Sequence, residues 1–535
     1  MNALLMEKLS KKVQHALKLS GFNVRREYCY LIVKKFQESN KNLESDFEEN
    51  VKSICSSLET QSLAGHSIEK ANIETTIEMC LKSGYDRNET VFNVINAFDF
   101  PKLCYNTTRK IYSKDVESSK LLPVADAKIK LFFERYSSIL QRTKRSFSHS
   151  LLGAEKNHLK LQTVDYLLTL SEAKLDHTLI LGSLLQVAEN KYFLEDPTGI
   201  VQLDLSHANY HTGFFVENVF VLVNGYYEDR ILCVSTIALP PGEEYQDSRP
   251  SFGNINYFGG NSDVPLRDSK TLKRHLLENK NAMFMFFSDV WLDNNLIFDK
   301  LEKLFMKTEQ FAQPIAFVFM GNFMAESQGN ESLDVLKKLF KKFAELISKF
   351  PNIVALSQFV FIPGLLDPCT PHIVPRLELP TYVTEDMQKI LPNAIFATNP
   401  CRIQYCTKEI VIFRADLVPK FMQGTLNKPR KQEIGNNLAK TLISQGHLSP
   451  MALNALTVHW DFDYCLSVYP LPDLIVVGDR SESYQGIYKN CIVVNPGQFC
   501  ADEFPFKMYY PNNDLQNAIE DCVVDVDDVA ESSDM

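Results

Sequence analysis

The sequence predicts a multidomain α/β protein, because three hydrophobic patterns follow one another along the chain. Apolar residues recur first at helical spacing, then in short runs of strand character separated by turns, and last in strands that alternate with amphipathic helices. The 535 residues exceed the roughly 250–300 that one hydrophobic core supports. With 45% hydrophobic and 23% charged residues, the composition is that of an ordinary globular protein.

The first 82 residues carry the helical pattern. One apolar stripe ends at Ser20 and Gly21, and it consists of Leu4, Leu5, Leu9, Val13 and Leu17. Further helices are expected near residues 25–37, 43–58 and 67–81. We therefore expect a small four-helix domain over residues 1–82, with the alternative that these helices simply pack on the body of the protein.

The pattern weakens between residues 83 and 159, which we interpret as a linker with docked segments. This stretch contains QRTKRSF, in which Arg142, Lys144 and Arg145 form a small basic cluster. A solvated loop is the favoured interpretation of this cluster, and a nucleic-acid contact is the alternative.

Residues 160–262 contain the short strands. Five runs (TLILGSLLQVAE, KYFLED, IVQLDL, VFVLVNGYYED and ILCVSTIAL) are separated by turn signals such as DPTG and NG. Five strands in so short a span predict a Greek-key barrel of the OB type. Between Thr178 and Leu232 there are two basic and seven acidic residues, a balance that would repel a phosphate backbone. The barrel is therefore predicted to be a structural or protein-binding module, with single-stranded DNA binding as the alternative.

Residues 263–510 carry the alternating pattern. Strands are expected at 283–287 and 315–320 and in the run SQFVFIPG, with helices at 296–311 and 333–350 between them. Further strands are expected near 394–397, 410–413, 474–477 and 491–494. Apolar strands that are buried on both faces and joined by helices predict an α/β sandwich.

The loops SDVW, GNFMA, PGLLD and GDRS follow these strands in the order found in calcineurin-like metallophosphoesterases. That resemblance implies a site for two metal ions, which would activate a water molecule and hold a phosphate group. Asp289 matches the first metal ligand of the pattern. The scaffold residues Gly321, Pro363, Gly364 and Gly478 also match it.

Most of the metal ligands of that pattern are replaced. Histidine positions are occupied by Trp291, Leu366, Asp479 and Ser481, and Leu365 stands in place of a ligand asparagine. The two aspartates of the second loop are replaced by Asn322 and Ala325, whereas the third loop retains Asp367 and Pro368. His447, in SQGHLSP, could correspond to the lone family histidine, or it could be a structural side chain.

Leucine, tryptophan and alanine cannot coordinate a metal ion, so we expect no metal cofactor and no hydrolysis at this site. A phosphoesterase or exonuclease that uses unusual ligands is the alternative. We further hypothesise that Trp291, Leu365 and Leu366 fill the former metal cavity. In that case the substitution Trp291→Ala costs about 3–5 kcal/mol. The remaining carboxylate, Asp289, would accept backbone N–H groups and fix its loop.

Charge and cysteine usage limit the remaining function classes. The net charge is −10, and the tail from Pro511 holds eight acidic residues and no lysine or arginine. A body of nearly neutral charge makes any DNA contact mainly indirect, and residues 511–535 are predicted to be a disordered acidic tail.

The 12 cysteines show no zinc spacing. No apolar run has membrane-spanning length and the N-terminus is too charged for a signal peptide, so we expect a cytosolic or nuclear protein without a membrane contact.

Several longer peptides resemble one family. They are FFSDVWLDN, TNPCRIQYCTKEIVIFR, ISQGHLSP, FLEDPTGIVQLDLS and FGNINYFGG. Together with the helical N-terminus, they resemble the B-subunit family of the eukaryotic replicative DNA polymerases, and within it the branch of DNA polymerase epsilon. The resemblance covers nearly the whole chain.

This resemblance implies a non-catalytic subunit that acts in nuclear DNA replication. The barrel and the inactive phosphoesterase domain would bind the zinc-containing C-terminal region of the polymerase catalytic subunit. The N-terminal domain would be similar to the lid region of AAA+ ATPases and would contact the GINS part of the replicative helicase. Other small polymerase subunits would be reached through the complex, and the residues that make these contacts are not indicated by the sequence.

Overall fold

The computed structural model describes residues 3–19, 22, 24–38, 90–115, 117–150, 161–169, 174–311, 313–326, 331–368 and 372–524, with single positions between 54 and 77. Two of the expected N-terminal helices are present as α1 (Ala3–Leu19) and α2 (Arg26–Glu38), and their apolar faces share a core that includes Val13, Leu17 and Ile32. The third and fourth helices fall largely outside the described residues, so the four-helix domain remains a prediction. None of the helices in the ranges above is long and apolar enough to cross a membrane.

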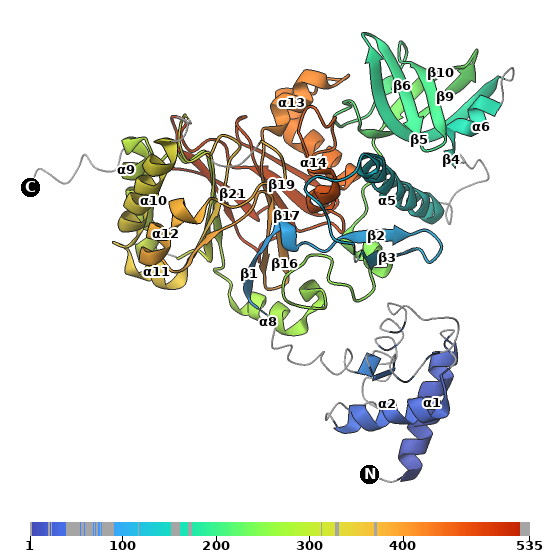
Figure 1. Cartoon of the computed structure of the whole chain (residues 1–535), viewed down its shortest axis with the longest axis horizontal. Helices are drawn as coiled ribbons and strands as arrows, with labels where there is room; N and C mark the ends of the chain where they lie inside the picture. The colour runs from blue at the N-terminus through green and yellow to red at the C-terminus, as the bar shows by residue number, and fades with distance from the viewer. Residues whose placement is uncertain are drawn as a thin grey trace, which may run out of the picture.

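A β-barrel lies at one end of the molecule (Figure 1). Its five main strands are those expected from the sequence: β5 (Leu175–Ala188), β6 (Lys191–Asp196), β7 (Gly199–Asp204), β9 (Phe220–Glu228) and β10 (Ile231–Ala238). The barrel closes because β9 pairs with both β10 and β5. Short additions are β4 (Leu161–Gln162), α6 (Val164–Thr169) and β8 (Asn209–Tyr210). Alternating residues of the strands point inward, including Ile180, Leu194, Val221 and Leu232.

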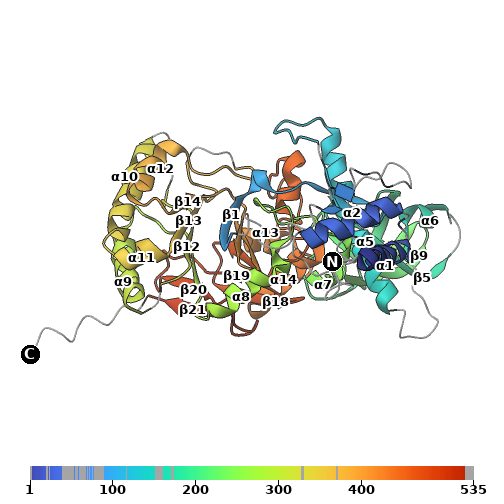
Figure 2. The ribbon, with the colours of Figure 1, turned by 90° about the horizontal axis from the view of Figure 1, so that it is seen from below.

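An α/β sandwich of two six-stranded sheets forms the centre. The first sheet has the order β14-β13-β12-β11-β20-β21, and β11 to β14 run parallel. Its strands are β11 (Phe284–Ser288), β12 (Ala316–Met320), β13 (Gln358–Ile362), β14 (Ala394–Phe396), β20 (Pro505–Tyr509) and β21 (Ile519–Val523). Its outer face is covered by α9 (Asn295–Phe311), α10 (Glu331–Ile347), α11 (Pro351–Leu356) and α12 (Thr381–Ile390), as Figures 1 and 2 show.

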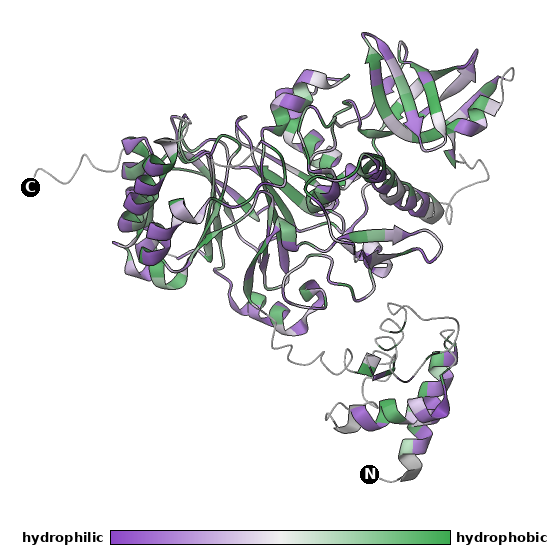
Figure 3. Cartoon of the chain, viewed as in Figure 1, coloured by the Kyte–Doolittle hydropathy of each residue, from purple (hydrophilic) through white to green (hydrophobic). Residues whose placement is uncertain are grey.

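The second sheet has the order β1-β15-β16-β17-β19-β18. Its strands are β1 (Phe92–Asn96), β15 (Cys401–Tyr405), β16 (Lys408–Arg414), β17 (Leu474–Gly478), β18 (Tyr484–Tyr488) and β19 (Cys491–Asn495). An apolar core between the sheets includes Phe286, Val318, Ile412 and Val476. The far face packs against α14 (Ile434–Gln445). Figure 3 shows the central strands mostly hydrophobic, and the outer helices striped.

Short elements complete the connections. They are η1 (Ala97–Asp99), β2 (Leu103–Asn106), β3 (Ile111–Lys114), α7 (Tyr245–Ser248), η2 (Arg249–Ser251), η3 (Leu266–Asp268), α8 (Lys270–Glu278), α13 (Leu417–Gly424), η4 (Lys431–Glu433) and η5 (Trp460–Leu466). The segment we interpreted as a linker, 83–159, thus supplies a strand of the second sheet, because β1 pairs with β15 along its full length.

The prediction of a disordered tail from Pro511 is wrong for its first part. Residues Ile519–Val523 form β21, which pairs with β20 in antiparallel register. The acidic side chain of Asp521 contacts the buried ammonium group of Lys507, and the carboxylate of Glu520 accepts the hydroxyl of Tyr510 at 3.0 Å, so two acidic residues of this segment have structural partners. Val524 reaches the core of the outer layer. Residues 525–535 lie outside the described residues.

The basic cluster at residues 142–145 is also not a solvated loop. It belongs to α5 (Asp126–Ser150), which runs between the barrel and the sandwich. Arg142 is fully buried and donates to the carbonyl groups of residues 443–445 at the C-terminal end of α14. Arg145 forms two hydrogen bonds to the carboxylate of Glu243, at 2.9 and 2.8 Å. These two arginines are used for packing between domains, so they are not available for nucleic acid.

Candidate functional site

The loops that follow β11, β12, β16 and β17 converge on one side chain, the guanidinium group of Arg414. Arg414 is the last residue of β16 and is completely buried. The convergence follows from topology, because the C-terminal ends of neighbouring parallel strands meet at one edge of a sheet, and the two parallel pairs face each other here. Arg414 ends the family peptide TNPCRIQYCTKEIVIFR, but the sequence indicates no role for it.

Every N–H group of the Arg414 guanidinium has an oxygen partner. Nη2 donates to both carboxylate oxygens of Asp289, at 2.9 and 3.1 Å. Nη1 donates to Asp416 Oδ1 at 2.8 Å and to the Gly478 carbonyl at 3.0 Å, and Nε donates to the Gly321 carbonyl at 2.5 Å. Burial alone lowers the pKa of Arg414, but the carboxylates of Asp289 and Asp416 raise it above its ordinary value. The side chain is therefore a permanently charged cation inside the protein.

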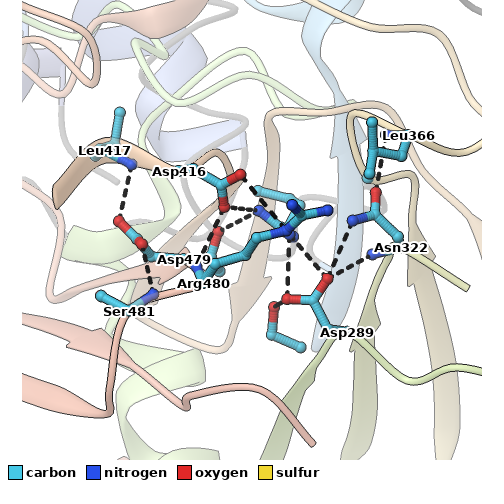
Figure 4. Close-up of polar contacts among 12 residues, drawn as sticks. Asp289, Asn322, Leu366, Asp416, Leu417, Asp479, Arg480 and Ser481 are labelled. Atoms are coloured by element: carbon cyan, nitrogen blue, oxygen red, sulfur yellow. Dashed lines mark hydrogen bonds and ion pairs between the residues drawn. The ribbon is translucent and has the colours of Figure 1, made fainter. Parts of the chain in front are cut away.

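Asp289, which binds this cation, also faces Asn322 (Figure 4). The backbone N–H and the side-chain amide of Asn322 both donate to Asp289 Oδ1, at 3.2 and 3.1 Å. The amide oxygen of Asn322 accepts the N–H of Leu366 at 2.8 Å. Asp289 is thus held by Arg414 and Asn322. It accepts a backbone N–H group, as predicted, and it also forms an ion pair with Arg414, which was not predicted.

Asp367 fixes the second and third loops to each other. Its carboxylate accepts the N–H groups of Phe323 at 2.8 Å and of Gly364 at 2.7 Å. Complete burial raises the pKa of Asp367 to about 6, although these backbone bonds act in the opposite direction. A side chain on Gly321 has no space, because its Cβ would lie 2.0 Å from Asp367 Oδ2. The retained glycine therefore reflects close packing of the loops.

The fourth loop has a separate hydrogen-bond network. Asp479 accepts the N–H groups of Leu417 and Val418, at 2.8 and 2.7 Å, where α13 begins. It also accepts the N–H of Ser481 at 2.9 Å (Figure 4). Burial raises the pKa of Asp479. Asp479 and Ser481 stabilise this turn and the start of the helix, so these two replacements serve the local fold.

The hypothesis that Trp291, Leu365 and Leu366 fill the former cavity is wrong. Leu366 is 39% exposed, and Trp291 and Leu365 are half-buried. Trp291 packs at the margin of the core under α9 and α10. The convergence point itself is polar and is occupied by the arginine, which satisfies the buried oxygens of the loops better than an apolar side chain could. Ala325, also half-buried, donates its N–H to the carboxylate of Asp293.

His447 does not contact these loops in any interaction of the described residues. Its Nδ1 accepts the N–H of Ser449 at 3.0 Å, and its Nε2 lies 3.3 Å from Asp463 Oδ1. Arg135 of α5 binds the same carboxylate with two hydrogen bonds, of 2.9 and 2.5 Å. Burial, assisted by the Arg135 charge, lowers the pKa of His447. The structural interpretation of this histidine therefore fits its surroundings better than a metal-binding one.

The donor set does not fit a binuclear metal centre. Both oxygens of Asp289 receive hydrogen bonds from a cation, and the oxygens of Asp367 and Asp479 receive backbone N–H groups. Among the residues that the structure describes, no three His, Cys, Asp or Glu side chains form a group able to hold a metal ion. The geometry holds loops together, and these three carboxylates are not free to activate water.

Comparison with known families agrees with this domain order. The model for the B-subunit of DNA polymerases alpha and epsilon matches residues 284–486. The model for the OB-fold domain of DNA polymerase epsilon subunit 2-like proteins matches residues 125–241, which confirms the predicted OB barrel and adds α5 to it. The model described as DNA polymerases epsilon N terminal matches residues 5–80.

Curated relatives match over most of the chain. DNA polymerase epsilon subunit 2 of Homo sapiens is 38% identical over 518 residues, which cover 95% of this chain and 97% of that protein. The Drosophila melanogaster protein of the same name is 36% identical over 94% of this chain and 96% of its own length. A probable DNA polymerase epsilon subunit 2 of Caenorhabditis elegans is 27% identical, over 98% and 96%. The chain therefore belongs to the family of DNA polymerase epsilon subunit 2.

Proposed function

We propose that this chain is a non-catalytic accessory subunit of DNA polymerase epsilon that works in the nucleus during DNA replication. It binds the zinc-containing C-terminal region of the catalytic subunit through its barrel and sandwich. Its N-terminal domain tethers the polymerase to the GINS part of the replicative helicase. Support comes from the family matches, which extend over all three parts of the chain.

The observation that carries the non-catalytic assignment is the arginine at the convergence of the loops. Hydrolysis by a binuclear centre needs carboxylate or imidazole ligands that are free to bind metal and to activate water. Here the one retained ligand, Asp289, is neutralised by Arg414 through two hydrogen bonds in a fully buried ion pair. A cation fixed to the chain opposes the binding of a second cation at the same carboxylate.

A groove between the barrel and the sandwich supports the assignment of a protein partner. Its volume is about 740 Å³. It is lined by α5, by the β5 and β9 side of the barrel and by residues 452–454, with an apolar surface from Ile129, Phe132, Phe133, Leu185, Phe220 and Leu453. Ile129 is 72% exposed and Phe133 is 55% exposed, which is unusual for large apolar residues on one helix. The acidic Glu195 and Glu217 at the same groove favour a partner segment with basic residues beside its apolar anchors.

Co-purification of the tagged protein from nuclei tests the partner. We expect a large polymerase chain to remain bound after nuclease treatment, because the contact is between proteins. The double variant Ile129→Glu and Phe133→Glu should lose most of that chain. The matched control is Val187→Glu, which alters an exposed apolar residue of β5 outside the groove lining. Recovery of neither a polymerase nor helicase components with the unaltered protein would count against the proposal.

A separate assay tests the absence of catalysis. The purified protein is incubated with a generic phosphodiester and added Mn²⁺, and we expect no turnover above the buffer rate. Stoichiometric bound metal, together with turnover that disappears in Asp289→Asn, would instead establish a phosphoesterase with unusual ligands.

A further inference from the structure

Arg414 connects the two sheets of the sandwich. Its five acceptor oxygens belong to residues 289, 321, 416 and 478. The loops after β11 and β12 come from the first sheet, and those after β16 and β17 come from the second sheet. One side chain thus holds four strand ends at the edge where the loop motifs of a metallophosphoesterase would hold their metals.

The local charges balance around this side chain. Asp289 and Asp416 supply two negative charges, Arg414 supplies one positive charge, and Arg480 lies 3.7 Å from Asp416 on the more exposed side. Removal of the Arg414 side chain leaves a fully buried carboxylate with no cation, which is among the costliest changes that a protein interior can undergo. The oxygens left behind are carboxylate and carbonyl oxygens, the donor type that binds hard divalent cations.

We propose that Arg414 is a built-in replacement for a structural cation: its guanidinium group does the cross-linking that metal ions would do between these loops. The residues do not fit a metal as long as the arginine is present, because it uses the oxygens that a metal would need. Once the arginine is removed, the same oxygens form a vacant cation site. This inference is independent of which partner the chain binds.

Chemical rescue of Arg414→Ala tests the proposal. The variant should unfold at a temperature roughly 5–15 °C lower than the unaltered protein. Low millimolar guanidinium, Mn²⁺ or Ca²⁺, added separately, should recover at least half of that shift, and Mn²⁺ should give a saturable electron paramagnetic resonance binding curve near one site per chain. The unaltered protein should show neither the recovery nor the bound Mn²⁺.

Arg402→Ala is the matched control. Arg402 is also buried, but its guanidinium donates to the carbonyl groups of Tyr257, Phe258 and Ser467, and among the described residues no carboxylate forms a salt bridge with it. Its loss should destabilise the protein without creating an anionic cavity, so no divalent cation should restore stability. A destabilised Arg414→Ala that no cation rescues, or rescue of both variants to the same extent, would overturn the proposal.

If Arg414→Ala gives no soluble protein, a comparison of Arg414→Lys with Arg414→Met tests the proposal. Lysine keeps a positive charge near Asp289, whereas methionine keeps similar volume without charge. The proposal requires that Lys retains clearly more stability than Met, measured as the unfolding temperature or as the soluble yield. Equal behaviour of the two would show that Arg414 matters only for its volume.

Discussion

At the scale of the residue, Trp291 stands at a former ligand position but is less buried than a true core residue. It is half-buried at the margin of a core, whereas Phe287 on the preceding strand is fully buried and stacks between Phe319 and Phe506. We expect Trp291→Ala to cost only about 1–2 kcal/mol, and Phe287→Ala about 3–5 kcal/mol. Urea unfolding of the two variants measures the difference. Equal losses would restore Trp291 as a core residue.

His447 should give the stability of the protein a recognisable pH dependence. Its folded-state pKa is below the ordinary value of 6.5, so the unfolded chain binds a proton more readily. The contribution is therefore fully present above pH 6.5 and is lost as the pH falls through the lower folded-state pKa. The charged groups that face the ring are Arg135 and Asp463.

The measurement is the unfolding temperature between pH 7.5 and 5 for the unaltered protein and for His447→Gln. The curve of the unaltered protein should fall more steeply than that of the variant below pH 6.5. Parallel curves would mean that folding does not change the pKa of His447, and a curve that rises as the pH falls would mean that the folded state holds the ring protonated.

At the scale of the element, α5 acts as a clamp between the barrel and the sandwich. Arg135 and Arg145 form ion pairs with residues outside the helix, Asp463 and Glu243, and Tyr469 donates its hydroxyl group to the same Glu243. The double variant Arg135→Met and Arg145→Met should free the barrel, because the buried Arg135 pair alone is worth about 3–5 kcal/mol when one partner is removed.

Solution X-ray scattering and limited proteolysis measure this release. We expect a larger radius of gyration and new cleavage between the barrel and the sandwich. Lys128→Met, at an exposed position of the same helix, is the control and should leave both unchanged. An unaltered scattering curve for the double variant would show that other contacts, such as the two hydrogen bonds between Phe220 of β9 and Gln445 of α14, hold the domains without the ion pairs.

Because of β21, chains truncated just before and just after this strand should differ in solubility and unfolding temperature. A chain that ends at Ala518 loses β21, so β20 becomes an exposed edge and Lys507 loses its contact with Asp521. We expect this chain to be less soluble and to unfold at a lower temperature. A chain that ends at Val524 keeps the pairing and should behave like the full-length protein. Equal solubility and unfolding temperature of the two truncated chains would contradict a structural role for β21.

At the scale of the whole molecule, charge limits direct DNA binding. The net charge is −10, and acidic residues outnumber basic ones along the strands of the barrel. We expect the isolated protein to bind single-stranded DNA weakly and with a steep decrease as salt increases. Nanomolar binding that tolerates salt and disappears when the exposed barrel residue Tyr226 is changed to Ala would favour the DNA-binding alternative.

The sequence predicted the elements whose apolar pattern is local. The strands β11, β12 and β13 and their helices were expected nearly at their observed positions, because continuous buried runs and helical stripes depend on neighbouring residues. The strand β15 was missed because CRIQY contains Arg402 and Gln404, whose buried polar groups are satisfied by distant carbonyl groups and by the Cys406 carbonyl. The strand β1 was missed because its partner is far away in sequence.

The sequence predicted the loops that form the candidate site, but it did not predict the arginine on which they converge. The loop positions, including Asp289 and Asn322, lie where the motif order indicated. Arg414 was not recognised, because an arginine at the end of an apolar strand is ordinarily exposed, and only the topology shows that four loops close over it. The signal that could have identified it is the sequence IVIFRAD, in which an apolar run of four residues is followed by Arg414 and Asp416 at the edge where the other loops converge.

The pairing of β1 with β15 sets an order for synthesis on the ribosome. Phe92 is the partner of Tyr405, so the whole barrel and half of the sandwich are translated between the two strands. At the usual rates of translation, β1 leaves the ribosome roughly 15–60 s before its partner. During that interval the barrel strands are complete and can pair, while β1 has no sheet partner.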